Sequence, residues 1–307
     1  GVPVREQCVE SQQSWLAACY TQADLAGLKQ STNQFSQQQK KKQKQNKADH
    51  VCHLDPSLWA AQFPSCGGLR QSPINIVTSK VHVNSALPPF NFIGHTNRIN
   101  ITVENKGHSA HFALPQLVRL MGGGLPGHYR AAQFHFHWGA NGRPGSEHTI
   151  DGERFPMELH IVHIKEPYGS LAEAEHDMAG IALLAFLFEV KLQDDFIIKT
   201  LSTTIPNFRL SDIIPSAQEL HSYYRYVGSM TTPGCEQAVA WTVFLRTLSI
   251  SSRQVSSRRP KPMIDIFRPT QPLDGRVVYR SKAGAALTGP IHLWFGVLSV
   301  VLGTIIH

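Results

Sequence analysis

The chain has 307 residues, which fits one large domain or two average ones, and its formal net charge is +7. Charged residues are sparse at 17%, and Gly, Pro and aromatic residues are spread through the middle of the chain. This composition excludes a largely disordered protein and favours a β-rich globule. Five of the lysines lie within Lys40–Lys47, so the rest of the chain carries a net charge of only +2. A lysine run without aromatic residues is typical of a solvated tail, and we therefore expect no nucleic-acid partner.

Residues 1–50 form a polar N-terminal segment. Its stretch Gln30–Lys47 reads QSTNQFSQQQKKKQKQNK and lacks the apolar side chains whose burial would offset the entropy of ordering. We expect this segment to be disordered. A globular pattern extends from about residue 51 to about residue 278, and residues 279–307 form a third region of different character.

Strand patterns dominate the body of the chain. Apolar and polar side chains alternate over three stretches, and a fourth is continuously apolar, as in a buried strand. These four stretches are Ala131–Trp138, Met157–Ile164, Ala238–Leu245 and Ile181–Val190. Short amphipathic helices are expected over Leu171–Met178 and Asp194–Thr204. The sequence has neither long repeats nor alternating strand–helix units, so we predict one strand-dominated domain of the α/β class with short peripheral helices.

The C-terminal region begins with small residues at Ser281, continues with a spacer and ends in the apolar stretch Ile291–Ile306. This stretch has about 16 residues, fewer than the roughly 20 that a spanning helix needs. Small residues, a spacer and a terminal apolar tail are the layout of a GPI-anchor signal. We expect attachment at Ser281, although Ala283 and Gly284 also satisfy the rule. The alternative is a C-terminal strand or helix of the core.

The cysteines indicate an oxidising compartment. None of the five belongs to a CxxC pair, which argues against a thiolate metal site, whereas scattered single cysteines suit disulfides. They are Cys8, Cys19, Cys52, Cys66 and Cys235. Asn100 begins the glycosylation sequon Asn-Ile-Thr. Together these features favour a glycoprotein of the secretory pathway.

The motif QFHFHWG, which starts at Gln133, carries a candidate metal site. Because side chains alternate across a strand, His135 and His137 project from one face while aromatic residues project from the other. His160, in a later strand-like segment, can supply a third imidazole. Three neutral nitrogen ligands without cysteine suit zinc, and a fourth position left to water makes such a site catalytic. The alternative is that the two strand histidines are half-buried and bind nothing.

Seven dispersed motifs together resemble the α-class carbonic anhydrases, in that family's order and spacing, across about residues 52–278. They are RQSPINI from Arg70, NKGH from Asn105, QFHFHWG from Gln133, GSEHT from Gly145, ELHIVH from Glu158, GSMTTPG from Gly228 and RPTQPL from Arg268. The likeness is greatest to the membrane-anchored types IV and XV, whose hallmark Thr-Thr-Pro-Gly-Cys is present at Thr231–Cys235. The resemblance implies one domain built on a large, mostly antiparallel twisted sheet.

The resemblance also implies the activity, which is the reversible hydration of carbon dioxide to bicarbonate and a proton. One Zn²⁺ is implied at His135, His137 and His160. Zinc lowers the pKa of a coordinated water toward neutrality, a property for which carbonic anhydrases are the standard example. Thr231, oriented by Glu147, is implied to orient the attacking hydroxide geometrically. Thr232 is implied to contact the departing bicarbonate.

His108 resembles the family's proton shuttle. An imidazole suits that role because its unperturbed pKa of about 6.5 lies near the operating pH. The alternative for His108 is an ordinary exposed loop histidine. His111 takes a position where the family often carries Asn or Gln, and it either perturbs or assists the shuttle.

Further residues carry over as supports and as a pocket wall. Gln133 and Glu158 resemble the residues that accept hydrogen bonds from His135 and His160. A backbone carbonyl near Ile266 serves His137 in the family. The wall that receives carbon dioxide corresponds to Val162, Leu183, Met230, Val239 and Trp241. Two of these, a leucine and a methionine in place of the commoner valine and leucine, are expected to narrow the pocket.

The family pattern implies a disulfide between Cys66 and Cys235. It also implies a second between Cys19 and Cys52, which leaves Cys8 unpaired. The implied location is the extracellular face of the cell membrane, where bicarbonate or acid–base transporters are the expected partners and pH regulation the expected role.

A catalytically silent carbonic-anhydrase-like binding module is the rival hypothesis. Silent branches of the family typically lack a zinc-ligating histidine. This chain has all three histidines together with Thr231, Glu147 and His108, which favours the enzyme.

Overall fold

The computed structural model describes residues 7–9, 18–20, 55–105, 109–140, 143–191, 204–251, 265 and 267–282. The chain divides into two compact units, Gly1–His50 and Val51–His307. In the first unit β1 (Gln7–Val9) pairs antiparallel with β2 (Ala18–Tyr20), and Cys8 lies opposite Cys19 in the register. The stretch Gln30–Lys47, for which we expect disorder, lies outside the described residues.

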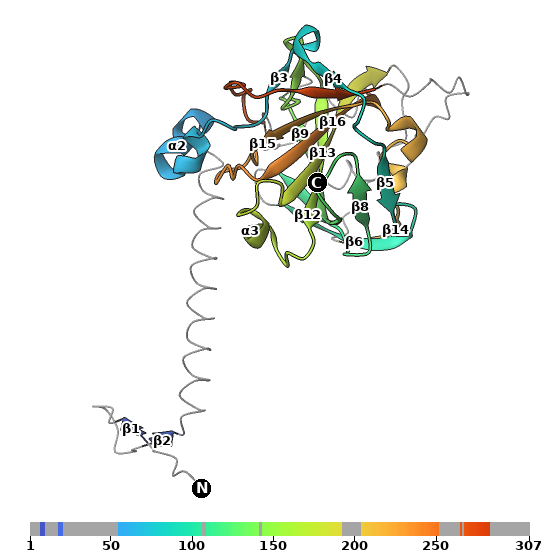
Figure 1. Cartoon of the computed structure of the whole chain (residues 1–307). Coiled ribbons are helices and arrows are strands. Elements are labelled where there is room, and N and C mark those ends of the chain that lie inside the picture. The colour runs from blue at the N-terminus through green and yellow to red at the C-terminus, as the bar shows by residue number, and fades with distance from the viewer. Residues whose placement is uncertain are drawn as a thin grey trace. The chain divides into compact units, whose positions relative to one another are not determined.

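A twisted sheet of twelve strands forms the second unit (Figure 1). The ten strands of its main path, from one edge to the other, are β14 (Thr204–Phe208), β6 (Ile99–Asn105), β7 (Ala110–Ala113), β9 (Tyr129–Trp138), β12 (Met157–Lys165), β13 (Ile181–Lys191), β16 (Val239–Ser251), β15 (Tyr223–Gly228), β17 (Tyr279–Ser281) and β4 (His82–Asn84). β8 (Arg119–Gly122) pairs with β9, and β5 (Phe90–Ile93) pairs with β8. Only β13–β16 and β17–β4 are parallel along this path, so the predicted strand-dominated, mostly antiparallel fold is confirmed.

Short elements surround this sheet. A second sheet of three strands consists of β11 (Glu153–Arg154), β10 (Thr149–Ile150) and β3 (Asn75–Ile76). The two short α-helices among the described residues are α2 (Trp59–Gln62) and α3 (Leu171–Ala174). The 3₁₀ turns are η1 (Pro56–Leu58), η2 (Pro64–Gly67), η3 (Thr78–Lys80), η4 (Leu210–Asp212) and η5 (Ala217–Glu219).

The predicted elements agree with the structure at the strands and differ at the helices. Each of the four predicted strand stretches falls on β9, β12, β13 or β16. The helix predicted over Leu171–Met178 ends at Ala174. The chain turns there because the Asp177 carboxylate binds Lys165 and the backbone N–H of Ala179 instead of facing solvent on a further helical turn. Of the other predicted helix, residues 194–203 lie outside the described residues, and Thr204 begins strand β14.

Alternation along the central strands separates a packed core from a polar site. On β12, Leu159 and Ile161 belong to a core cluster rich in phenylalanine, whereas Val162 belongs to a second cluster. Six fully buried rings in the first cluster are Phe112, Phe134, Phe136, Phe186, Phe188 and Phe244. Burial of each such ring contributes roughly 1.5–3 kcal/mol. The strands that carry the candidate ligands therefore rest on a rigid aromatic layer.

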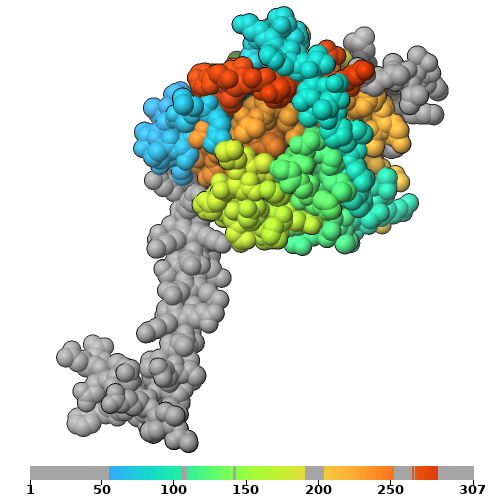
Figure 2. Space-filling view, viewed as in Figure 1, coloured from blue at the N-terminus to red at the C-terminus, as the bar shows by residue number. Residues whose placement is uncertain are grey.

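The first and last strands of the twelve-stranded sheet in chain order, β4 and β17, lie side by side. β17 pairs in parallel with β4, so that Tyr279 lies opposite His82 and Ser281 opposite Asn84. Figure 2 shows this arrangement at the surface, where the orange-red C-terminal segment lies against cyan residues.

Arg225 on β15 is a buried cation without an anionic neighbour among the described residues. It is 8% exposed, and its guanidinium lies over the rings of Phe90 and Tyr223. Neither Nε nor Nη2 finds a hydrogen-bond acceptor within the described parts of the chain. Burial lowers the Arg225 pKa to about 10, which still leaves it charged at neutral pH. An unpaired buried charge of this kind destabilises a fold.

We expect Arg225→Met to raise the free energy of unfolding by about 1–3 kcal/mol, because methionine fills similar space without a charge to desolvate. Urea unfolding followed by circular dichroism measures this change. Arg246→Met is the matched control, because Arg246 is 44% exposed in a long surface ion pair with Glu219 and should change stability little. A lower unfolding midpoint for Arg225→Met would contradict the expectation.

His95 and His163 form a buried pair on the far side of the sheet from the candidate ligands. Their rings stack with centroids 6.5 Å apart, and each Nδ1 donates to the carbonyl two residues earlier. Burial lowers the pKa of His95 to about 4 and that of His163 to about 3. Because both values lie below the unfolded value, the stability that depends on the neutral rings is complete above about pH 6.5 and is lost as the pH falls toward the folded values.

Acid should therefore destabilise the metal-free protein through this pair. Between pH 6.5 and 5 we expect His95 alone to account for roughly 1.5 kcal/mol of the loss. A His95→Phe variant should accordingly lose less stability than the parent over that interval, as measured by urea unfolding at both pH values. Identical losses in parent and variant would show that His95 does not couple folding to pH.

Candidate metal centre

Three histidines from two neighbouring strands converge on one face of the sheet. His135 and His137 come from β9, and the register between β9 and β12 places His160 directly opposite His135. The three residues are 4%, 5% and 1% exposed, and each offers a ring nitrogen within 4.8 Å of the others. Since cross-strand neighbours lie about 5 Å apart at Cβ, period-two alternation and this register are enough to assemble the cluster.

Hydrogen bonds select the nitrogen that each ring offers. Gln133 Oε1 lies 2.9 Å from His135 Nδ1, and Glu158 Oε1 lies 2.7 Å from His160 Nε2. Both oxygens accept, so these two nitrogens carry protons, and His135 Nε2 and His160 Nδ1 are the ones available to a metal. His137 Nε2 lies 3.0 Å from His160 Nδ1.

The donor set fits Zn²⁺. Tetrahedral zinc with Zn–N bonds of about 2.0–2.1 Å requires nitrogens about 3.3 Å apart, close to the 3.0 Å between His137 and His160. Three neutral imidazoles without a thiolate are also the ligand type of catalytic zinc sites. A second group of close side chains, His148, Glu158 and His160, is already joined by hydrogen bonds and does not require a metal.

Glu158 is a fully buried carboxylate with four donors. Oε1 accepts from the rings of His160 and His148, at 2.7 and 2.6 Å, and Oε2 accepts from the backbone N–H groups of Glu147 and His148, at 2.8 and 2.7 Å. Burial alone raises the Glu158 pKa, but the charges and hydrogen bonds of the two histidines hold it well below its usual range. The carboxylate therefore stays ionised and fixes the orientation of the His160 ring.

His148 and Tyr226 extend this network and were not singled out from the sequence. The Tyr226 hydroxyl lies 2.7 Å from His148 Nε2 and donates to Ser72 Oγ at 2.9 Å. Trp241 packs its ring edgewise against both His148 and His160, at 4.8 and 4.9 Å. The signal available in the sequence was the histidine directly after Glu147. Its importance follows only from the fold, which brings Tyr226 to it.

Glu147 lies next to the histidine cluster. It is buried, its Oε1 accepts from the backbone N–H of Arg268 at 2.7 Å, and its Oε2 lies 3.5 Å from His137 Nε2. The resemblance implies a hydrogen bond from Thr231 to this carboxylate. Among the described residues, however, none donates to Oε2. This oxygen lies 3.5 Å from His137 Nε2 and 3.8 Å from His160 Nδ1, and Thr231 is buried in the turn after β15.

The predicted pocket residues form one apolar cluster beside the histidines. Val162, Leu183 and Trp241 follow one another in register across β12, β13 and β16. Val239 belongs to the same cluster, and the partly buried Met230 packs against it. Thr232 is half-buried in the adjoining turn, where its carbonyl accepts from the N–H of Cys235. Through Trp241, whose ring packs against that of His160, this apolar cluster adjoins the histidine cluster.

Comparison with known proteins identifies the family. The model of the eukaryotic-type carbonic anhydrases matches residues 54–282. The chain belongs to this family. It is 39% identical over 261 residues to carbonic anhydrase 4 of Oryctolagus cuniculus, covering 78% of this chain and 84% of that protein. It is 37% identical over 257 residues to carbonic anhydrase 15 of Mus musculus, with 74% and 79% coverage, and 34% identical over 276 residues to carbonic anhydrase 12 of Homo sapiens, with 81% and 77% coverage.

These matches confirm the predicted resemblance to α-class carbonic anhydrases of types IV and XV and the predicted enzyme class. Within the described part of the chain, no helix combines the length and apolar character needed to cross a bilayer.

The carbonic anhydrase resemblance also singles out His108, Ile266 and His111. His108 and Ile266 fall outside the described residues. His111 lies on β7 opposite His135, and the two rings stack with centroids 5.1 Å apart and planes within 9°. His111 therefore packs directly on the ring of a candidate ligand.

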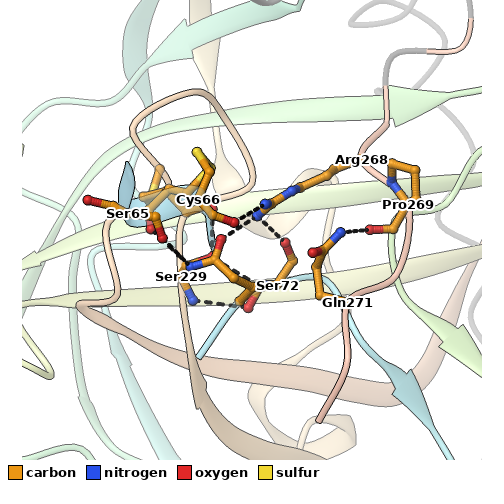
Figure 3. Close-up of a disulfide and its surroundings, with 10 residues drawn as sticks. Ser65, Cys66, Ser72, Ser229, Arg268, Pro269 and Gln271 are labelled. Atoms are coloured by element: carbon orange, nitrogen blue, oxygen red, sulfur yellow. Dashed lines mark hydrogen bonds between the residues drawn. A yellow bond between two sulfur atoms is a disulfide. The ribbon is translucent and has the colours of Figure 1, made fainter. Parts of the chain in front are cut away.

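The disulfide between Cys66 and Cys235 is present, as predicted. Arg268 joins the segments on either side of this disulfide region. Its guanidinium donates to the carbonyls of Cys66 and Ser72, at 3.2 and 2.9 Å (Figure 3). The backbone N–H of Arg268 also donates to Glu147. One residue therefore supports both the region of the disulfide and the carboxylate beside the histidine cluster. The second predicted disulfide includes Cys52, which lies outside the described residues.

The predicted modification sites have different surroundings. Asn100 is exposed on β6, and its side-chain oxygen accepts from the backbone N–H of Asn207. Ser281 is buried at the end of β17. Its hydroxyl donates to the carbonyl of His221 and accepts from the N–H of Tyr223. The alternative anchor residues Ala283 and Gly284 lie outside the described residues.

We expect Glu158→Gln to weaken zinc binding by about 10- to 100-fold. A neutral amide accepts more weakly from the His160 ring, and its NH₂ group opposes the two backbone donors. Competition with a chromophoric chelator measures the affinity. Glu173→Gln, on the exposed helix α3, is the matched control. Equal affinities for the two variants would show that Glu158 does not support the site.

Proposed function

We propose that this chain is a zinc enzyme that interconverts carbon dioxide and bicarbonate, with release or uptake of a proton. The observation that carries the proposal is a cluster of three buried imidazoles adjoining a buried apolar cluster. Family membership supports carbon dioxide hydration as the general activity. The fit of the donor set to tetrahedral zinc supports the choice of metal.

His135 Nε2, His137 Nε2 and His160 Nδ1 would hold the ion. When bound, Zn²⁺ supplies Lewis-acid activation of a water molecule at neutral pH, for which carbonic anhydrases are the standard example. Gln133 and Glu158 keep two of the rings in the tautomer that such a site requires.

The apolar wall would receive carbon dioxide. Val162, Leu183 and Trp241 present a dry surface to a small molecule without a net dipole, and exclusion of water strengthens every polar contact at its edge. Leu183 and Met230 reach further into this space than shorter side chains would, so they narrow the pocket.

Thr231 would orient the nucleophile, with Glu147 as the acceptor for the threonine hydroxyl. Among the described residues, one Glu147 oxygen accepts from Arg268 and the other has no donor. A fixed hydrogen-bond direction contributes by geometry and not by charge. Thr232, next in the chain, would contact bicarbonate as it leaves.

A proton must leave the site in each hydration cycle. His108 is the proposed carrier because it belongs to the segment between β6 and β7, directly before the strand that packs on His135. An imidazole there can accept and release a proton near neutral pH.

We further propose that the protein works at the extracellular face of the cell membrane, held by a GPI anchor and near bicarbonate or acid–base transporters. The Cys66–Cys235 disulfide supports an oxidising compartment, and the exposure of Asn100 supports glycosylation. Because Ser281 is bonded into β17, Ala283 or Gly284 is the better candidate for the anchor.

Stopped-flow carbon dioxide hydration tests the proposed reaction. The purified protein should be active, lose activity when zinc is removed, and regain it when zinc returns. Thr231→Ala should lower kcat/KM by about 100-fold through loss of orientation. Thr204→Ala, exposed on the edge strand β14, should leave the rate unchanged. A folded, zinc-loaded protein without activity would instead identify a silent binding module.

A further inference from the structure

Arg154 lies close to the candidate metal centre without touching it. It ends β11, and the two-residue turn Asp151–Gly152 connects β11 to β10. Both turn residues have positive φ, 50° and 84°, as a type I′ hairpin requires. This turn fixes the register in which Arg154 lies opposite Thr149, close in sequence to Glu147.

The Arg154 guanidinium joins two backbone segments that are distant in sequence. Nη1 donates to the carbonyl of Ser146. The same group lies over the ring of Phe267, with Cζ 4.6 Å from the ring centroid. A guanidinium stacked on an aromatic face in a partly buried place is attracted by the negative face of the ring, and its planar shape sets the direction of the donated hydrogen bond.

These two contacts lie on either side of Glu147. Ser146 precedes it in the chain, and Phe267 precedes Arg268, whose N–H binds the Glu147 carboxylate at 2.7 Å. The Ser146 segment has little freedom, because a Cβ on Gly145 would lie 1.8 Å from the backbone nitrogen of Gly139. Arg154 thus fixes both the peptide that carries Glu147 and the peptide that binds its side chain.

The charge of Arg154 also matches its surroundings. Glu147 and Glu158 are buried carboxylates, and both interact favourably with the Arg154 cation. Arg154 hydrogen-bonds to neither within the described residues, so its influence on the metal ligands passes through the backbone segments and through the electrostatic field.

We propose that Arg154 is a positioning residue, which holds Glu147 and the Phe267–Arg268 segment in the arrangement that retains the metal. This inference rests on the proposed zinc site. It predicts that loss of the guanidinium or of the ring beneath it loosens zinc binding, although neither side chain is a ligand.

Zinc retention tests the proposal with the zinc-loaded full chain. Arg154→Met and Phe267→Leu should each release zinc to excess chelator about 10-fold faster than the parent. The double variant should be no faster than the single variants, because both substitutions remove the same clamp. Phe267→Tyr keeps the aromatic face and should keep the parent rate. The visible absorption of the Co²⁺-substituted protein should change in Arg154→Met and not in Phe267→Tyr.

Arg130→Met is the matched control, because Arg130 also donates to a backbone carbonyl, that of Tyr168, but contacts neither segment. If Arg154→Met released zinc at the control rate with an unchanged Co²⁺ spectrum, the proposal would be wrong. Additive effects of the Arg154 and Phe267 substitutions would also overturn it. A parent protein that fails to hold zinc would instead refute the proposed zinc site, so the two failures are distinguishable.

Discussion

The buried carboxylate of Glu158 is the interaction on which the rest of the centre depends. Its two oxygens accept four hydrogen bonds, two from imidazole rings and two from successive backbone N–H groups. One charged group therefore sets the His160 tautomer and the path of the chain through Glu147 and His148. A carboxylate so deeply buried is tolerable only because every one of these donors is present.

The supports around this carboxylate come from distant parts of the chain. Arg268 binds Glu147 through its backbone and the Cys66 and Ser72 segments through its side chain. The disulfide attaches the same region to the turn after β15 that carries Thr231. Several segments thus meet around Arg268, and the acceptors on its guanidinium explain why a buried arginine is retained there although burial lowers its pKa to about 10. Arg225 lacks such acceptors within the described residues, and the two buried arginines therefore contrast in what they contribute to stability.

Much of the fold and of the ligand set could be predicted, because both depend on short-range periodicity. Alternation over Ala131–Trp138 and Met157–Ile164 indicated strands and placed two histidines on one face. That His160 lies opposite His135 depends on the register of two strands about 25 residues apart, which local patterns do not determine. The same limit applies to Arg154, since only the hairpin register and the packing of Phe267 bring it near Glu147. The helix predicted over Leu171–Met178 was too long, because a tertiary contact between Asp177 and Lys165 competes with helix propagation.

The pairing of β4 with β17 has a consequence for how the protein is made. Synthesis proceeds from the N-terminus, so β4 exists long before the strand that it must join. Until residues 279–281 are available, β4 has no partner among the described strands and β15 presents an open edge that can pair with another chain. A nascent or truncated polypeptide that ends before Tyr279 therefore exposes an unpaired edge of the sheet, which favours aggregation. Recombinant versions should retain the sequence through Lys282.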